Sequence, residues 1–167
     1  MRKFALLVLS FAVCTAAHAD WRSDLTNASA QKAGATVDQK LGIATPAPAG
    51  AEVYFINLKN GDTVTSPFLV QFGLKNAGVC PAGLQSPGTG HHHLLIDNPK
   101  IDLTAPRPAT AQIRHFGKGQ TQTLLSLKPG KHTLQLLFAD WKHQPFNPSV
   151  QSATITLTVT GPATSAK

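Results

Sequence analysis

The chain has 167 residues and a formal net charge of +7, with 15 lysines and arginines against 8 acidic residues. This length is sufficient for one domain with an apolar core. The basic residues are scattered rather than gathered in a stripe, and no nucleic-acid-binding module accompanies them, so we expect no nucleic-acid partner.

The N-terminal segment predicts export. Arg2 and Lys3 precede a short apolar run, and Ala17 and Ala19 supply small residues ahead of a cleavage point after Ala19. Residues 1–19 are therefore predicted to be a signal peptide, and the mature protein to be periplasmic or secreted. No later segment approaches the ~20 apolar residues of a membrane-spanning helix, so we expect no membrane span after signal removal.

Residues 20–50 differ in composition from the rest of the chain. They are rich in alanine, glutamine and lysine, and they close on the proline- and alanine-rich sequence ATPAPAGA. Prolines at this spacing cannot continue a helix. We therefore predict an N-terminal arm and linker over residues 20–50, a folded domain over residues 51–162 and a short tail over residues 163–167.

Short apolar stretches separated by turn residues follow one another through residues 51–162. Alternating polarity between glycine- and proline-containing turns is typical of antiparallel strands. About seven such strands without a helical stretch predict an all-β fold, an immunoglobulin- or fibronectin type III-like antiparallel β-sandwich. The clearest predicted strands are EVYFIN (52–57), SPFLVQFGL (66–74), HHHLLID (91–97), TQTLLSL (121–127), HTLQLLFAD (132–140) and ATITLTVT (153–160).

Most of the histidines are expected at one end of this sandwich. In an immunoglobulin-like domain HHHLLID would be strand C and HTLQLLFAD strand F, and the B–C, D–E and F–G loops gather at one end. His132 is expected to pack at the opposite end, and Asp97 lies ~20 Å along the strand from His91. The residues expected at the first end are His91, His92, His93, His115, His143 and Cys80.

Strand alternation divides the three consecutive histidines. Side chains point to opposite faces in turn, so His91 and His93 face one way and His92 the other. The row formed by His92, Leu94 and Ile96 suits the inward face. We therefore expect His91 and His93 to face outward or toward the loops, where they can bind one metal ion if other loops complete the site.

The residue types around this pair favour a transition metal. Neutral imidazole suits copper(II) and zinc, whereas no carboxylate cluster accompanies it that would suit calcium or magnesium. The only methionine is Met1, which excludes a methionine-lined copper(I) site in the mature chain. The predicted ligands are His91, His93, His115 and His143, with His92 and Cys80 as possible secondary ligands.

Two other roles fit the same histidines. They can donate hydrogen bonds to loop carbonyls and brace a long irregular connection. Catalysis has less support, because there is no Gly-x-Ser-x-Gly sequence and no carboxylate pair near the histidines, and Cys80 with His91 alone is a weak nucleophile–base signal. Cys80 is also the only cysteine outside the predicted signal peptide, which excludes an intramolecular disulfide. We predict no catalytic residue and expect that the protein is not an enzyme.

A metal-independent interaction module is a further alternative. Loops at one end of a sandwich form a ready binding surface. The predicted loop WKHQPFNPS carries Trp141 and Phe146, which are useful contact residues for a protein or glycan of the cell envelope. Under this interpretation the histidines are structural.

The motifs GHHHLLID, HFGKGQT and PGKHTLQL together resemble the bacterial family of small exported proteins described as domain of unknown function 4399. The resemblance covers residues 51–162. It implies an exported immunoglobulin-like sandwich with histidine-rich loops at one end, and it implies no activity. Family members carry more histidine in the loop where this chain has Trp141 and Phe146. The motif positions that carry over are His91, His92, His93, Asp97, His115, Phe116, Gln120, His132, Asp140 and His143.

Overall fold

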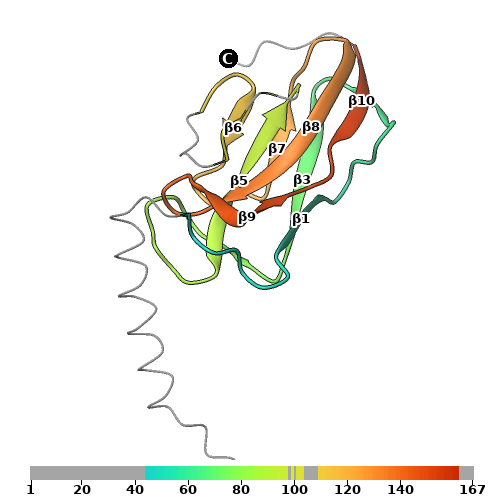
Figure 1. The fold of residues 1–167 in the computed structure, drawn as a ribbon. Helices are drawn as coiled ribbons and strands as arrows, with labels where there is room; N and C mark the ends of the chain where they lie inside the picture. The colour runs from blue at the N-terminus through green and yellow to red at the C-terminus, as the bar shows by residue number, and fades with distance from the viewer. Residues whose placement is uncertain (1–43, 98, 100, 104–108, 162–167) are drawn as a thin grey trace, which may run out of the picture. The chain divides into compact units, whose positions relative to one another are not determined.

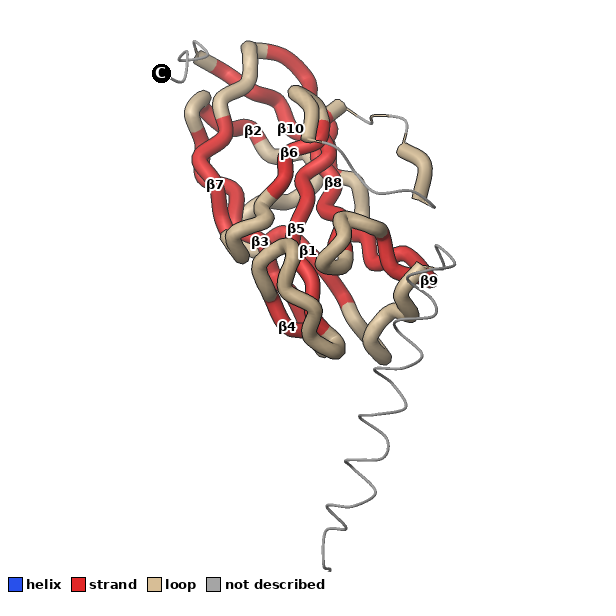
Figure 2. The backbone as a smooth tube through the Cα atoms, turned by 90° about the vertical axis from the view of Figure 1, so that its left-hand side faces the viewer, coloured by secondary structure: helices blue, strands red, loops and turns tan. Residues whose placement is uncertain are grey.

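The computed structural model describes residues 44–97, 99, 101–103 and 109–161. The predicted signal peptide (1–19), residues 20–43 of the predicted arm and the predicted tail (163–167) lie outside the described residues. The described part of the chain consists of strands, turns and loops without a helix (Figure 2). Its ten strands form two sheets, which confirms the predicted all-β sandwich.

The smaller sheet has three strands in the order β1-β3-β7. The larger sheet has the order β2-β10-β8-β5-β4, with β6 also paired to β5 and β9 also paired to β8. The strands of the smaller sheet are β1 (Glu52–Phe55), β3 (Phe68–Lys75) and β7 (Gln122–Leu125). Those of the larger sheet are β2 (Thr63–Thr65), β4 (Gly78–Val79), β5 (Thr89–Ile96), β6 (Ile113–His115), β8 (Gly130–Ala139), β9 (Pro145–Gln151) and β10 (Ile155–Thr160).

The pairing of the strands is consistent with an immunoglobulin-like sandwich. β8 lies between β5 and β10 and runs antiparallel to both, which places the predicted strands C and F side by side (Figure 1). β3 lies between β1 and β7 in the other sheet, also antiparallel to both. The short strand β2 pairs in parallel with β10. The strand containing HHHLLID is therefore central in the larger sheet.

Four strands of the structure were not predicted from the sequence. β2, β4 and β6 span only two or three residues each, which is too short for an alternating pattern to show. β9 was predicted to be a loop because it contains Pro145 and Pro148. Prolines are accepted there because β9 pairs irregularly with β8, with a register shift between Phe138 and Ala139.

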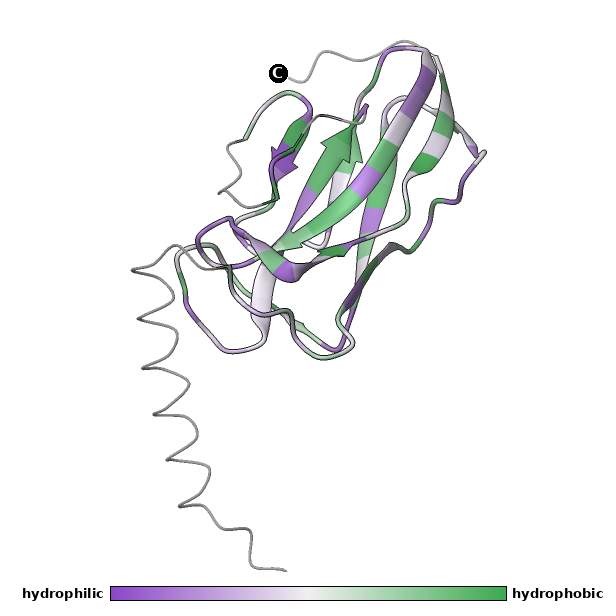
Figure 3. Ribbon diagram, viewed as in Figure 1, coloured by the Kyte–Doolittle hydropathy of each residue, from purple (hydrophilic) through white to green (hydrophobic). Residues whose placement is uncertain are grey.

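The main core lies between the two sheets. In Figure 3 green residues of β10 alternate with paler ones, and the burial of β10 alternates in step, so this strand contributes one face to the core. From β8 the core receives Leu134, Leu136 and Phe138, and from β5 it receives Leu94 and Ile96. Full burial of one such side chain stabilises the fold by about 1.5–3 kcal/mol. Leu134, Leu136 and Phe138 are two residues apart along β8, so their side chains share the face that packs into this core.

A second, smaller apolar cluster covers the opposite face of β5. It consists of Leu95, Ile113 and Leu137, with Ile101 packed against it. His91 and His93 are both 0% exposed, and they contact His143 of the β8–β9 turn and His115. Of the two orientations predicted for them, outward or toward the loops, the structure shows the second, and both side chains point away from the main core.

Candidate metal centre

Four imidazoles from three separate segments of the chain meet in the larger sheet. The possible ligand atoms of these side chains all lie within 4.8 Å of one another. The Nε2 atom of His91 lies 3.0 Å from Nδ1 of His143 and 3.0 Å from Nε2 of His93. The ring centroid of His115 lies 4.8 Å from that of His91 and 4.3 Å from that of His143. We call this group, His91, His93, His115 and His143, the histidine cluster.

Strand geometry brings three of the four imidazoles together. His91 and His93 are two residues apart on β5, so their side chains share a face. β6 pairs with β5 in a register that sets His115 directly opposite His93. Residues opposite each other on antiparallel strands have Cβ atoms about 4.5–5.5 Å apart, which is close enough for two rings to meet. The sequence placed His115 in a loop ahead of β7, whereas the structure places it on a strand beside β5.

A tight turn between β8 and β9 presents the fourth imidazole. The buried Asp140 carboxylate accepts backbone N–H groups from Lys142 and Gln144 at 2.8 and 3.0 Å, and its second oxygen accepts the Thr45 hydroxyl at 2.7 Å. The backbone carbonyl of Asp140 accepts the N–H of His143. His143 has a φ of 66°, a conformation that a non-glycine residue keeps only when its surroundings hold it. Asp140 therefore fixes the turn that carries His143.

The loop after β4 ties together the segments that carry His115 and His143. The backbone N–H of Ala82 donates to the carbonyl of Gly117, just beyond β6, and the N–H of Gly83 donates to the carbonyl of Trp141. The first bond measures 2.8 Å and the second 2.9 Å. The loop thereby connects the end of β6 to the β8–β9 turn.

Burial keeps the His91 imidazole of β5 neutral at pH 7. Burial and then repulsion from His115 and His143 lower the pKa of His91 from 6.5 to about 3. The pKa of His115 is also lowered, first by burial and then by repulsion from His143. Neutral imidazole is the form that binds a metal ion. These side chains are therefore held in the state that coordination requires.

Hydrogen bonding inside the cluster is incomplete. The Nδ1 atom of His91 and the Nε2 atom of His115 are buried without a hydrogen-bond partner in the described part of the chain. A neutral imidazole has one donor and one acceptor nitrogen, and leaving either buried and unpartnered costs about 1–3 kcal/mol. Hydrogen bonds alone therefore do not account for the packing of four imidazoles. A metal ion accepts lone pairs from several imidazoles at once, which the rings cannot do for one another.

The structure separates the two predicted secondary ligands from the cluster. His92 points into the main core, where its ring centroid lies 5.2 Å from Phe72 and 5.3 Å from Phe138. Burial lowers the pKa of His92 from 6.5 to about 4. Cys80 is buried, and its thiol contacts the carbonyl of Leu84 at 3.7 Å. Neither side chain belongs to the group of residues that could hold a metal ion.

Of the two residues predicted to form a binding surface, Trp141 and Phe146, only Trp141 is exposed to any appreciable extent. Phe146 is 3% exposed and stacks on Phe138 with ring centroids 5.8 Å apart, so its assignment to a surface is wrong. The physical reason is that β9 turns back onto β8 and carries Phe146 into the main core. Trp141 remains partly exposed, with the ammonium group of Lys142 5.6 Å from its ring centroid.

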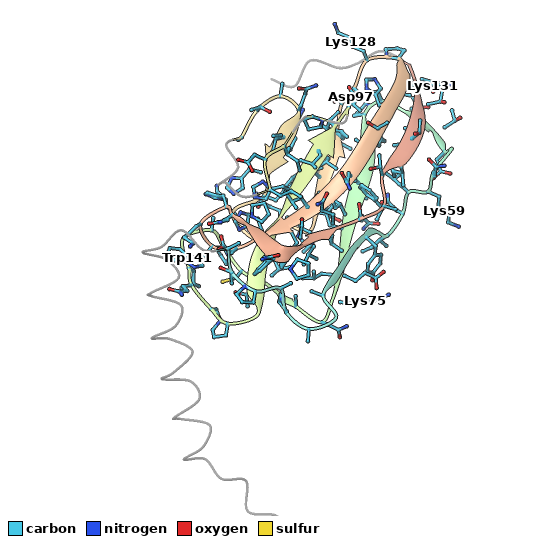
Figure 4. The ribbon with its side chains drawn as sticks, in the orientation of Figure 1. Lys59, Lys75, Asp97, Lys128, Lys131 and Trp141 are labelled. Atoms are coloured by element: carbon cyan, nitrogen blue, oxygen red, sulfur yellow. The ribbon has the colours of Figure 1, made fainter. Side chains whose placement is uncertain are left out.

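His132 and Asp97 lie at the other end of the larger sheet. Figure 4 shows Asp97, Lys128 and Lys131 at one end of the domain and Trp141 toward the other. The Nδ1 atom of His132 lies 3.0 Å from the Asp97 carboxylate, and its Nε2 atom lies 2.9 Å from the carbonyl of Lys128. Both ring nitrogens of His132 thus have acceptor partners, as expected of a structural histidine.

Two supporting residues had no assigned role in the sequence interpretation. Asp140 was noted only as a motif position, although an aspartate that closes a strand ahead of turn residues is a signal for side-chain capping of a turn. Thr45 falls in the predicted linker, yet it donates to Asp140, and its neighbour Ala47 donates a backbone hydrogen bond to Asn147. The end of the predicted linker therefore contacts the turn that carries His143.

These observations define an immunoglobulin-like β-sandwich that bears a group of four histidines able to hold a metal ion. Residues 70–160 match the model of the family described as "Domain of unknown function (DUF4399)". The match covers more than half of the chain, and the protein belongs to this family. Comparisons with curated proteins and with solved structures gave no match. In the described part of the chain there is no helix of the length and apolarity needed to cross a membrane.

Proposed function

We propose that this is an exported metal-binding protein whose histidine cluster holds one copper(II) or zinc ion. The observation that carries the proposal is the meeting of four imidazoles, two of them fully buried, with all possible ligand atoms within 4.8 Å. Imidazole nitrogen is a ligand that both copper(II) and zinc accept. The predicted signal peptide supports export.

His132 provides an internal comparison for the alternative role of structural bracing. Its two ring nitrogens lie within hydrogen-bond distance of a carboxylate and a backbone carbonyl; both partners are acceptors, so a neutral ring donates to one of them and a protonated ring to both. In the cluster, by contrast, Nε2 of His91 faces two other imidazole nitrogens and Nδ1 of His91 faces no partner among the described residues. A group of histidines that served only as braces would be expected to resemble His132. Coordination would explain the imidazole nitrogens that meet around Nε2 of His91 and the unpartnered Nε2 of His115.

The distances within the cluster suit coordination. Zinc binds imidazole nitrogen at about 2.0–2.1 Å, so two nitrogens of a tetrahedral site lie about 3.3–3.4 Å apart. The two nitrogen pairs of His91 measure 3.0 Å and no pair of ligand atoms in the cluster is more than 4.8 Å apart, so adjustments from a few tenths of an ångström up to about 1.5 Å would bring all four to tetrahedral spacing. Because all four positions are filled by protein ligands, the arrangement resembles closed sites, whereas catalytic zinc keeps an open position. We therefore propose binding rather than catalysis.

The test is metal uptake by the chain produced without a histidine tag. We expect one equivalent of copper(II) or zinc by elemental analysis and titration at pH 7.5, and weaker uptake at pH 5. The His91→Ala/His93→Ala variant removes both ligands of β5 and should bind none. The matched control is His132→Ala, which removes a histidine outside the cluster and should bind as the wild type does.

Circular dichroism establishes that each variant is folded before uptake is compared. His143→Ala is a second ligand variant, because its side chain is only partly buried and its loss leaves a smaller cavity. Wild-type protein that takes up neither metal would end the proposal. Equal uptake by the wild type and the His91→Ala/His93→Ala variant would do the same.

A further inference from the structure

A glycine beside the cluster makes room for one of its imidazoles. A β-carbon added at Gly117 would overlap the Cε1 atom of His115 and would lie 2.5 Å from Nε2 of the same ring. Side-chain carbons do not approach other heavy atoms so closely, so a larger residue at 117 would require the ring to move. The φ of Gly117 is not in the left-handed region, so a backbone requirement does not explain the glycine.

Gly117 also anchors the loop that joins the cluster's segments. Its carbonyl accepts the backbone N–H of Ala82 at 2.8 Å, and an added β-carbon would lie 3.2 Å from the Cβ atom of Ala82. The space above Gly117 is therefore shared by the His115 ring and the loop after β4. A side chain at this position would press on both.

Displacement of the His115 ring would affect its ligand atoms directly. The Cε1 atom lies between the two ring nitrogens, so pushing this edge moves Nδ1 and Nε2 together. The partly buried ring also contacts His93, opposite on β5 with centroids 5.0 Å apart, and His143 at 4.3 Å. It therefore cannot give way to a side chain at Gly117 without changing its position relative to these two imidazoles.

From this geometry we infer that Gly117 is a positioning residue, whose missing side chain seats the His115 imidazole in the metal-binding group. This inference rests on the proposed function for its metal readout, but the placement of the ring is a property of the metal-free protein. Gly117 acts through His115 and does not itself contact the ion. The consequence is that its effect on metal binding depends on the presence of the His115 ring.

The test is a double-mutant cycle on metal affinity. We expect Gly117→Ala to weaken copper(II) and zinc binding at least tenfold. In a His115→Ala background, where the ring is absent, the same glycine substitution should change affinity less than twofold. A loss of affinity that persists undiminished in the His115→Ala background would overturn the inference, as would wild-type affinity in Gly117→Ala.

The matched control is Gly73→Ala. An added β-carbon at Gly73 would overlap the ring of Tyr54, which is a comparable clash with an aromatic side chain in the smaller sheet. Gly73→Ala should lower the thermal unfolding temperature and leave the metal affinity unchanged. Equal loss of affinity in Gly73→Ala and Gly117→Ala would show a general effect on the fold and would overturn the inference.

A metal-free readout separates this inference from the proposed function. In the metal-free protein, nuclear Overhauser contacts from the His115 Hε1 proton to the His143 ring should be present in the wild type and lost in Gly117→Ala. If these contacts are retained, the inference fails whatever the metal data show. If the wild type binds no metal but the contacts are lost, only the proposed function fails.

If Gly117→Ala does not fold, the double variant His115→Ala/Gly117→Ala decides the question. Removal of the ring relieves the overlap with His115 and leaves the 3.2 Å contact with the Cβ atom of Ala82, which a shift of a few tenths of an ångström relieves, so the double variant should fold as His115→Ala does. A double variant that also fails to fold, beside a folded His115→Ala, would overturn the inference.

Discussion

Replacement of Asp140 by alanine should destabilise the protein and weaken metal binding together. The substitution removes an acceptor for the N–H groups of Lys142 and Gln144 and for the Thr45 hydroxyl. Hydrogen bonds to a charged group contribute about 1.5–3 kcal/mol each and do not add fully. Because Asp140 is 1% exposed, water does not readily replace it, and we expect the free energy of unfolding to fall by about 3–5 kcal/mol.

Urea unfolding of the metal-free protein measures this loss. With a slope of about 1–3 kcal/mol per molar urea, the midpoint should fall by at least ~1 M. Metal titration of the same variant should show affinity reduced more than tenfold, since the turn that holds His143 in its left-handed conformation has lost its support. Thr45→Val is the control, because it removes one of the hydrogen bonds to the carboxylate and should cost about 1.5–3 kcal/mol. The reasoning is refuted if Asp140→Ala costs no more than Thr45→Val, or if it binds metal as tightly as the wild type.

Three further predictions concern pH, the core and the ion. The pKa values of His91 and His92 are lowered from 6.5 to about 3 and about 4. Between these values and pH 6.5, the two histidines are protonated in the unfolded chain but not in the folded chain. The free energy of unfolding of the metal-free protein should therefore keep its full value above pH 6.5 and fall as the pH drops below 6.5. At pH 5 the loss should be about 2 kcal/mol per histidine. A urea midpoint that does not change between pH 7 and pH 5 would contradict this. Phe146→Ala should cost about 3–5 kcal/mol in the same assay, because the ring is buried against Phe138, and a change below ~1 kcal/mol would contradict its place in the core. Metal at a hundredfold excess over its dissociation constant should stabilise the wild type by about 2.7 kcal/mol, reversed by a chelator and absent in His143→Ala.

The sequence predicts the parts of the fold that repeat over many residues. β5, β8 and β10 are long enough for alternation to show, and the predicted strands HHHLLID, HTLQLLFAD and ATITLTVT coincide with them closely. Their adjacency follows from the immunoglobulin-like topology. The same alternation separates His92 from His91 and His93, and the structure shows His92 among aromatic rings of the core.

The features that the sequence does not predict depend on contacts between distant segments. β6 spans three residues, so no periodicity identifies it, and its pairing with β5 is what sets His115 opposite His93. The burial of Phe146 depends on the irregular return of β9 onto β8. The sequence therefore predicts His115 at the correct end of the molecule, but in a loop and not on β6. It predicts Phe146 on a binding surface, whereas the side chain lies in the core. Long-range pairing of this kind leaves no local pattern to read.

The origin of the cluster in three segments bears on which metal the protein would acquire. His91 and His93 come from β5, His115 from β6 and His143 from the β8–β9 turn, so an unfolded chain does not assemble the full group. If the chain is exported, as we propose, and crosses a membrane unfolded, it would complete the group only after folding at its destination. The choice between copper and zinc would then be made by the metal content of that compartment, and not by the cytoplasm in which the chain is synthesised.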